Sequence, residues 1–201
     1  MKPCKLLLAS VGATVLLGAF VASASADAFE STSQRIRGVF TAVEFHLPSA
    51  TARCALTIEG TLHSRSVSKT ARLLGYITRA DLGACATGAA TVLTSTLPWH
   101  VKYAGFSGVL PEISSIITRV IGASLRVKES GGIECLVRSS EVEPVTTNFH
   151  RNTATRVLET AEIRGTIRTG IECLGIAGSF RSDRGVVSVS NAVTRITVTL
   201  I

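Results

Sequence analysis

A period-two alternation of apolar and polar residues runs through most of the chain and constrains its fold more than any other feature. In residues 53–62 an apolar side chain recurs at Cys54, Leu56 and Ile58, and residues 194–201 repeat the pattern. Because the side chains of a strand point alternately to opposite faces, this pattern is typical of half-buried strands. Valine, isoleucine and threonine are abundant, and glycine or serine turns separate the runs. We therefore expect an all-β fold, either a β-sandwich or a Greek-key barrel.

One segment, residues 111–122, departs from this alternation. Its apolar residues fall at helical spacing, namely Ile113, Ile116, Ile117, Val120 and Ile121. We therefore expect one short helix near 111–122. A pair of strands is the alternative, because β-branched side chains are stiff and favour extended backbone.

The first 26 residues have the pattern of a secretory signal peptide. Lys2 and Lys5 precede an apolar run from Leu6 to Val21, and the small residues Ala24-Ser25-Ala26 follow it. The run is too short for a comfortable membrane span, so we expect cleavage after residue 26 and no transmembrane segment in the mature chain. The expected location is secreted or extracytoplasmic, in association with the cell envelope.

Residues 27–201 are expected to form a single β domain. The most linker-like segment is 139–148, which contains Glu141, Glu143 and Pro144, and it is a possible sub-boundary. A short internal echo favours one domain, because the run Gly132-Ile-Glu-Cys-Leu recurs as Gly170-Ile-Glu-Cys-Leu.

Four cysteines follow the predicted signal peptide: Cys54, Cys85, Cys135 and Cys173. An even number in an exported chain predicts two disulfides, and three pairings are open. Of these we favour Cys85 with Cys135 and Cys54 with Cys173. Zinc is the competing interpretation, but it requires closely spaced ligand pairs that this chain lacks. We expect no metal site.

The formal net charge is +7, from 21 basic and 14 acidic side chains. The arginines are scattered, and no basic block is interleaved with aromatic residues, so we expect no nucleic-acid partner. The partner stays open: an anionic envelope polymer or another surface protein suits such a basic surface. A solvated basic face without a partner is the alternative.

The densest group of distinctive side chains contains the chain's one tryptophan and lies at Trp99, His100, Lys102 and Tyr103. If this segment is a strand, Trp99 and Tyr103 share one face, while His100 and Lys102 share the other. These four residues are candidates for binding a sugar or an apolar ligand. In the alternative interpretation the aromatic face belongs to the core, which aromatic side chains dominate in small sandwiches.

Three runs form a longer pattern: Cys54-Ala-Leu-Thr-Ile-Glu-Gly, Leu97-Pro-Trp-His and Gly108-Val-Leu-Pro. The pattern resembles a family of small exported bacterial β proteins with no known activity, over roughly residues 30 to 140. The resemblance implies an exported β protein, and it supplies no catalytic residues.

An enzymatic interpretation centres on Ser130. The run Glu129-Ser-Gly-Gly is similar to the nucleophile motif of chymotrypsin-like proteases, and His63, Asp81 and Ser130 follow the order of that family's triad. The residues around His63 depart from the family's pattern, and we expect a turn at Ser130. This triad is therefore the weaker alternative. The chain shows no other catalytic or cofactor motif.

Catalysis by a pair of carboxylates that flank a cleft is a further enzymatic interpretation. Glu59, Glu134 and Glu172 each follow an isoleucine, on the strand face opposite the core, where solvated glutamates are expected. We therefore expect a secreted protein with a structural or binding role at the cell envelope, without a cofactor. The alternatives are a secreted hydrolase and an exported inhibitor-like binder that presents a loop near residues 87–90.

Overall fold

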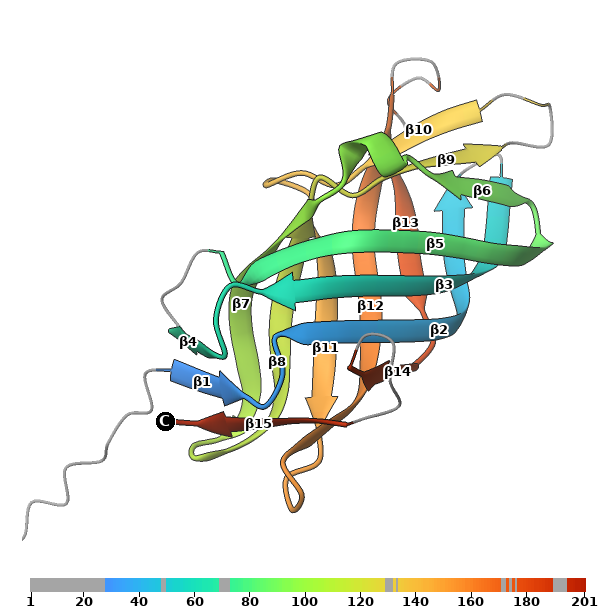
Figure 1. The fold of residues 1–201 in the computed structure, drawn as a ribbon. Helices are drawn as coiled ribbons and strands as arrows, with labels where there is room; N and C mark the ends of the chain where they lie inside the picture. The colour runs from blue at the N-terminus through green and yellow to red at the C-terminus, as the bar shows by residue number, and fades with distance from the viewer. Residues whose placement is uncertain are drawn as a thin grey trace, which may run out of the picture.

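The computed structural model describes residues 28–47, 50–68, 73–128, 132, 134–170, 173, 175, 177–189 and 195–201 (Figure 1). The predicted signal peptide at 1–26, the candidate nucleophile Ser130 and the candidate carboxylate Glu172 lie outside the described residues. Within them, every strand pairing is antiparallel.

Most of the strands close into a barrel. In chain order its members are β2 (Arg35–Leu47), β3 (Ala50–Leu62), β5 (Gly75–Thr87), β7 (Trp99–Val109), β8 (Glu112–Ile121), β11 (Val145–Arg151), β12 (Val157–Thr169), β13 (Ala177–Ser182) and β14 (Gly185–Ser188). Each strand from β2 to β12 pairs with the next member. Both β13 and β14 lie between β12 and β2, so the ring is closed.

The all-β prediction is confirmed, but the connectivity is neither a sandwich nor a Greek key. The barrel strands pair in chain order, as a meander. Short connections explain this order, since β7 and β8 are separated by two residues and β11 and β12 by five. Such connections place consecutive antiparallel strands side by side.

The helix expected near 111–122 is wrong, and the segment forms one continuous strand, β8, in place of the pair of strands given as the alternative. Ile116, Thr118 and Val120 point into the barrel and are buried, whereas Arg119 between them is exposed. Six β-branched residues in this strand favour extended backbone, and pairing with both β7 and β11 outweighs the helical spacing.

Shorter strands cover the two ends of the barrel. At one end, the upper right of Figure 1, β6 (Ala89–Val92) pairs with β9 (Ser124–Lys128), and β9 pairs with β10 (Glu134–Arg138). At the other end, β1 (Ala28–Ser31) lies between β4 (Ser66–Ser68) and β15 (Ile196–Leu200). The expected sub-boundary at 139–148 follows β10 and overlaps the start of β11, and both strands belong to the same sheet.

Two disulfides lie towards the first of these ends, and their pairing differs from the one we favoured. Cys54 of β3 is bonded to Cys85 of β5 with the Cα atoms 3.9 Å apart, and Cys135 is bonded to Cys173. Strand register explains both bonds. Cys54 and Cys85 are direct partners in the β3–β5 ladder, and Cys135 lies on β10, which pairs with the end of β12 just before Cys173.

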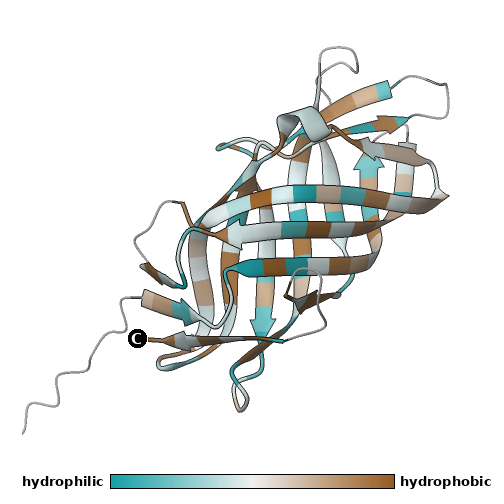
Figure 2. Ribbon diagram, viewed as in Figure 1, coloured by the Kyte–Doolittle hydropathy of each residue, from teal (hydrophilic) through white to brown (hydrophobic). Residues whose placement is uncertain are grey.

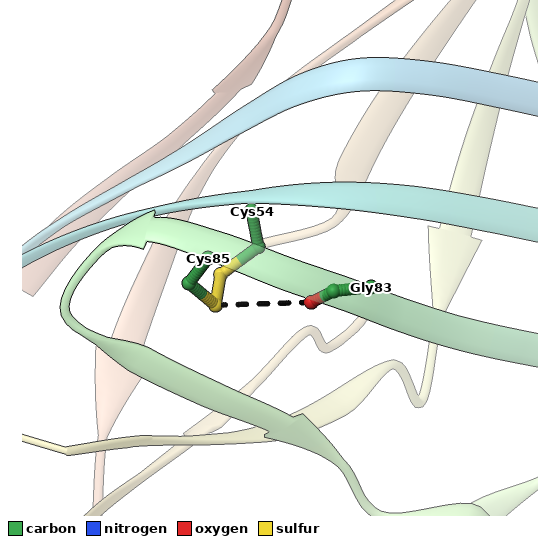
Figure 3. Close-up of a disulfide and its surroundings, with 3 residues drawn as sticks. All are labelled: Cys54, Gly83 and Cys85. Atoms are coloured by element: carbon green, nitrogen blue, oxygen red, sulfur yellow. Dashed lines mark hydrogen bonds between the residues drawn. A yellow bond between two sulfur atoms is a disulfide. The ribbon is translucent and has the colours of Figure 1, made fainter.

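The Cys54–Cys85 bond is shown in Figure 3. The carbonyl oxygen of Gly83 lies 4.0 Å from the Sγ atom of Cys85. A disulfide sulfur carries no proton, so this is a packing contact and not a donated hydrogen bond.

Large side chains fill the half of the barrel nearest β6, β9 and β10. The rings of Phe45 and Phe180 pack in a tilted arrangement with centroids 4.8 Å apart, and Val43, Val127 and Val137 are fully buried. The alternation that predicted strands is visible as bands of brown and teal along the strands in Figure 2. The inner face is therefore largely apolar, and the charged side chains lie on the outside except for the buried Arg151.

Candidate functional site

Charged side chains gather on the outer surface of β2, β3, β12 and β13 around two carboxylates. The first is Glu44. It accepts a hydrogen bond from Arg181 at 2.7 Å, lies 3.2 Å from the ring of His46, and forms an ion pair with Arg53 at 3.7 Å. The hydrogen bond from Arg181, followed by that with His46, holds the pKa of the Glu44 carboxyl below its ordinary value.

The second carboxylate, Glu162 on β12, has the same kind of surroundings. Its oxygens accept hydrogen bonds from Arg184 at 2.9 Å and from Arg164 at 3.4 Å, and His150 lies 3.7 Å away. The hydrogen bond from Arg184 is the main reason that the pKa of Glu162 lies below its ordinary value. Each glutamate is thus shared by two arginines, so cationic charge exceeds anionic charge in both clusters.

A hollow of about 530 Å³ lies on this surface, which we call the arginine groove. Arg53, Arg164 and Arg181 line it together with Glu44 and Asp183. The three guanidinium side chains are more than half exposed, and the Glu44 side chain is only 23% exposed. The groove therefore presents cations to solvent and keeps the Glu44 carboxylate behind them.

The second acid of the groove, Asp183, is occupied by the backbone of β2. Its carboxylate accepts hydrogen bonds from the Thr41 hydroxyl and from the Ala42 amide, the latter at 3.3 Å. These two donors lie where an irregularity shifts the β2–β3 register between Phe40 and Val43, and the Asp183 carboxylate provides their acceptor. Asp183 is therefore a structural acceptor rather than a partner for the groove arginines.

The groove arginines belong to a longer line of cations that we call the basic row. Neighbouring strands bring Arg53, Glu44, Arg181 and Arg164 into direct cross-strand register. The line continues from Arg164 through Thr146 to Arg119 and Lys102. Because direct partners in a sheet point to the same face, all of these side chains lie outside the barrel.

The basic row contains five cations: Lys102, Arg119, Arg164, Arg181 and Arg53. Among the described residues, Arg119 has no carboxylate partner, whereas Lys102 is paired with Glu141. By comparison, positive and negative charges are balanced on another part of the outer surface. There Arg37 pairs with Glu59 at 3.7 Å and Arg79 pairs with Asp81 at 2.6 Å.

No sequence motif marks the arginines of the basic row. Their outward positions follow from the period-two alternation, which was the available signal. Their alignment depends on strand register, which joins positions as distant as Glu44 and Arg181. The expected scatter of arginines along the sequence therefore coexists with a continuous row on the folded surface.

The four candidate ligand-binding residues of β7 divide between the two faces as the alternation predicts. Trp99 is 4% exposed, and its Nε1 donates a hydrogen bond to the Thr96 hydroxyl at 2.9 Å. Tyr103 points inward, its ring lies 5.5 Å from that of Phe29, and burial raises its pKa. His100 and Lys102 lie on the outer face, so the four residues form no common platform.

The alternative triad is not assembled by its described members. His63 follows the end of β3 and contacts the ring of Tyr76, with centroids 4.9 Å apart. Asp81 is the direct cross-strand partner of Thr57. Thr57 precedes His63 by six residues, which corresponds to about 20 Å along a strand at 3.3 Å per residue. This pair therefore lacks the histidine–carboxylate hydrogen bond that orients a catalytic base.

The described residues contain no group of three or more histidine, cysteine, aspartate or glutamate side chains able to hold a metal ion. No helix among them has the length and apolar composition needed to cross a membrane.

Comparisons with protein-family models, with curated proteins and with solved structures found no match to this chain.

Proposed function

We propose that this protein is an exported binding protein that attaches to an anionic polymer of the cell envelope through the arginine groove and the basic row. The observation that carries the proposal is the cross-strand register of Arg53, Arg181, Arg164 and Arg119 on one surface. The two disulfides are compatible with an extracytoplasmic location, which suits such a partner.

The chemistry of the groove favours carboxylate or phosphate groups as ligands. Guanidinium groups present a planar fork of donors that matches both anions. Glu44 and Glu162 each hold two arginines in place but neutralise only one of them. The remaining positive charge is available to a bound anion.

The length of the row favours a polymer over a single small anion. Adjacent strands are about 4.8 Å apart, so cations repeat at small multiples of that distance across the sheet. A flexible polyanion that contacts one arginine is then held close to the next, and the contacts reinforce one another. Attraction of this kind between exposed charges weakens as salt is added.

Retention of the purified protein on immobilised polyphosphate and polygalacturonate, with neutral dextran as the blank, tests the proposal. Arg164→Glu reverses a charge of the groove at a side chain that is 75% exposed. We expect this variant to elute from both polyanions at a lower salt concentration than the unaltered protein. The matched control is Arg79→Glu, which changes the net charge equally from a side chain that is 63% exposed outside the groove.

The comparison of these two variants separates a local site from general charge. If Arg79→Glu weakens retention as much as Arg164→Glu does, the protein binds by net charge alone and the groove is not its site. If the unaltered protein elutes with the dextran blank from both polyanions, the proposed function is wrong.

A further inference from the structure

The barrel interior holds an apolar cavity in the half that lies away from β6, β9 and β10. Its volume is about 100 Å³. Inner-face residues of seven barrel strands line it, and β1, β4 and β15 cover it at the end of the barrel seen at the lower left of Figure 1. This end differs from the filled half around Phe45 and Phe180.

The walls of the cavity are apolar and deeply buried. Six of the lining side chains are each less than 10% exposed: Phe40, Ile58, Ile77, Val120, Leu158 and Val198. They come from β2, β3, β5, β8, β12 and β15, so the cavity lies inside the barrel and not between two neighbouring strands. Water gains few hydrogen bonds in such a space, and apolar cavities of this kind stay dry.

Two glycines lie on one wall and permit close packing there, since a Cβ atom at Gly60 would lie 2.6 Å from the Tyr76 carbonyl oxygen. Gly38 lies between the inward residues Ile36 and Phe40, and Gly60 follows the inward Ile58 on the next strand. A Cβ atom at Gly38 would lie 3.1 Å from the Phe40 ring and 3.2 Å from Ile58, both of which line the cavity. A side chain at this position would therefore crowd Phe40 and Ile58, which lie close to the β2 backbone because residue 38 is glycine.

One polar spot interrupts the apolar wall. Thr118 of β8 and Thr147 of β11 are direct partners, are 3% and 2% exposed, and line the cavity side by side. The Thr118 hydroxyl donates a long hydrogen bond of 3.5 Å to the Thr147 carbonyl, and its oxygen can still accept a bond. The buried hydroxyl of Ser31, which also lines the cavity, donates a hydrogen bond to the Ser33 carbonyl at 2.7 Å.

The charged residues of the lining do not provide an internal counter-ion. The Glu59 carboxylate lies on the outer side of β3, in an ion pair with Arg37 at 3.7 Å, and Arg65 is exposed at the margin. An ion placed in the cavity would lose its hydration without gaining a partner. The cavity therefore favours a neutral occupant.

We propose that this cavity binds a small neutral apolar molecule that carries one hydroxyl group, and that this group donates its hydrogen to the Thr118 oxygen beside Thr147. The volume limits the ligand to a few carbon atoms, because an apolar protein cavity that binds benzene or xenon has about 150 Å³. The ligand reaches the cavity beneath β1 and β4. These two strands pair with each other over only three residues, so little structure must open.

Methyl NMR with xenon and 2-methylpropan-1-ol as probes tests this inference. We expect both probes to shift the methyl signals of Ile58, Val120 and Val198 around the cavity. The methyl signals of Val127 and Val137, which are fully buried at the filled end, serve as an internal control. No saturable shift at the cavity methyls, or equal shifts at both ends, overturns the cavity as a binding site.

The polar spot is tested separately by Thr118→Val, which keeps the shape of the side chain and removes its hydroxyl. We expect the alcohol to bind about fivefold more weakly, the loss typical of one neutral hydrogen bond, with xenon binding unchanged. Thr146→Val makes the same change on the outer face of β11 and should alter neither probe. Equal alcohol affinity in Thr118→Val and the unaltered protein overturns the assignment of the ligand's oxygen. These outcomes do not depend on the arginine groove.

Discussion

Arg151 ties the C-terminal strand to the barrel, and its replacement should release that strand. The side chain is 2% exposed, its Nε donates to the Val198 carbonyl at 2.8 Å, and its Nη1 donates to the Ile113 carbonyl at 2.7 Å. The same Nη1 lies 3.4 Å from Glu112, whose side chain is 46% exposed. The buried guanidinium thus joins β15 to the start of β8.

Arg151→Met removes both hydrogen bonds and leaves two inward carbonyls without these donors. Each lost partner costs about 1–3 kcal/mol. Relief from burying a guanidinium offsets part of that cost. We expect the free energy of unfolding in urea to fall by about 2–4 kcal/mol, a large share of the stability of an ordinary domain. Hydrogen exchange of the Ile196–Leu200 amides should accelerate most.

Arg156→Met is the matched control. Arg156 pairs with the same Glu112 at 3.5 Å, but its side chain is 51% exposed, so its ion pair contributes little. We expect a loss within about 0.5 kcal/mol. Equal losses in the two variants would refute the reasoning, and so would a loss in Glu112→Gln as large as that in Arg151→Met. Either result would mean that the ion pair, and not the carbonyl hydrogen bonds, holds the strand.

Three further perturbations probe the barrel, its disulfides and its charges. Gly75→Ala places a Cβ atom 2.0 Å from a β3 carbonyl and should cost about 3 kcal/mol in urea unfolding, whereas Gly105→Ala, with open space around it, should be near neutral. Replacing Cys135 and Cys173 by alanine reopens a 38-residue loop and should cost about 4 kcal/mol, checked against the oxidised parent. Folding lowers the pKa of Glu162 below its ordinary 4.5, so the resulting stability is full above pH 4.5 and is lost as pH falls through the lowered value. Glu162→Gln should flatten this acid dependence of the urea midpoint.

Local chemistry was enough to predict the strands and their faces. The final strand shows this, because Ile196 and Val198 are buried while the residues between and beside them are more exposed. The same holds for β7, where Trp99 and Tyr103 point inward and His100 points outward. The pleat of a strand depends only on its own backbone, so one alternating run is sufficient to assign its two faces.

The segment 111–122 marks the limit of such local patterns. Its isoleucines satisfy a helical spacing, yet they also suit an extended strand, and the choice between the two is made by neighbours. Pairing with β7 on one side and β11 on the other decides for the strand. Tertiary hydrogen bonds outweigh a helical periodicity of this length.

The sequence by itself determined an all-β protein with an apolar inner face, a charged outer face and an even set of cysteines suited to disulfides. The tertiary structure alone decided that the strands close as a meander, that Cys54 bonds Cys85, and that Arg181 lies beside Glu44. The physical reason is that every strand carries the same period-two pattern, so many pairings bury the same faces equally well. The disulfides, the basic row and the cavity all depend on which pairing forms, because each is built from residues that only register brings together.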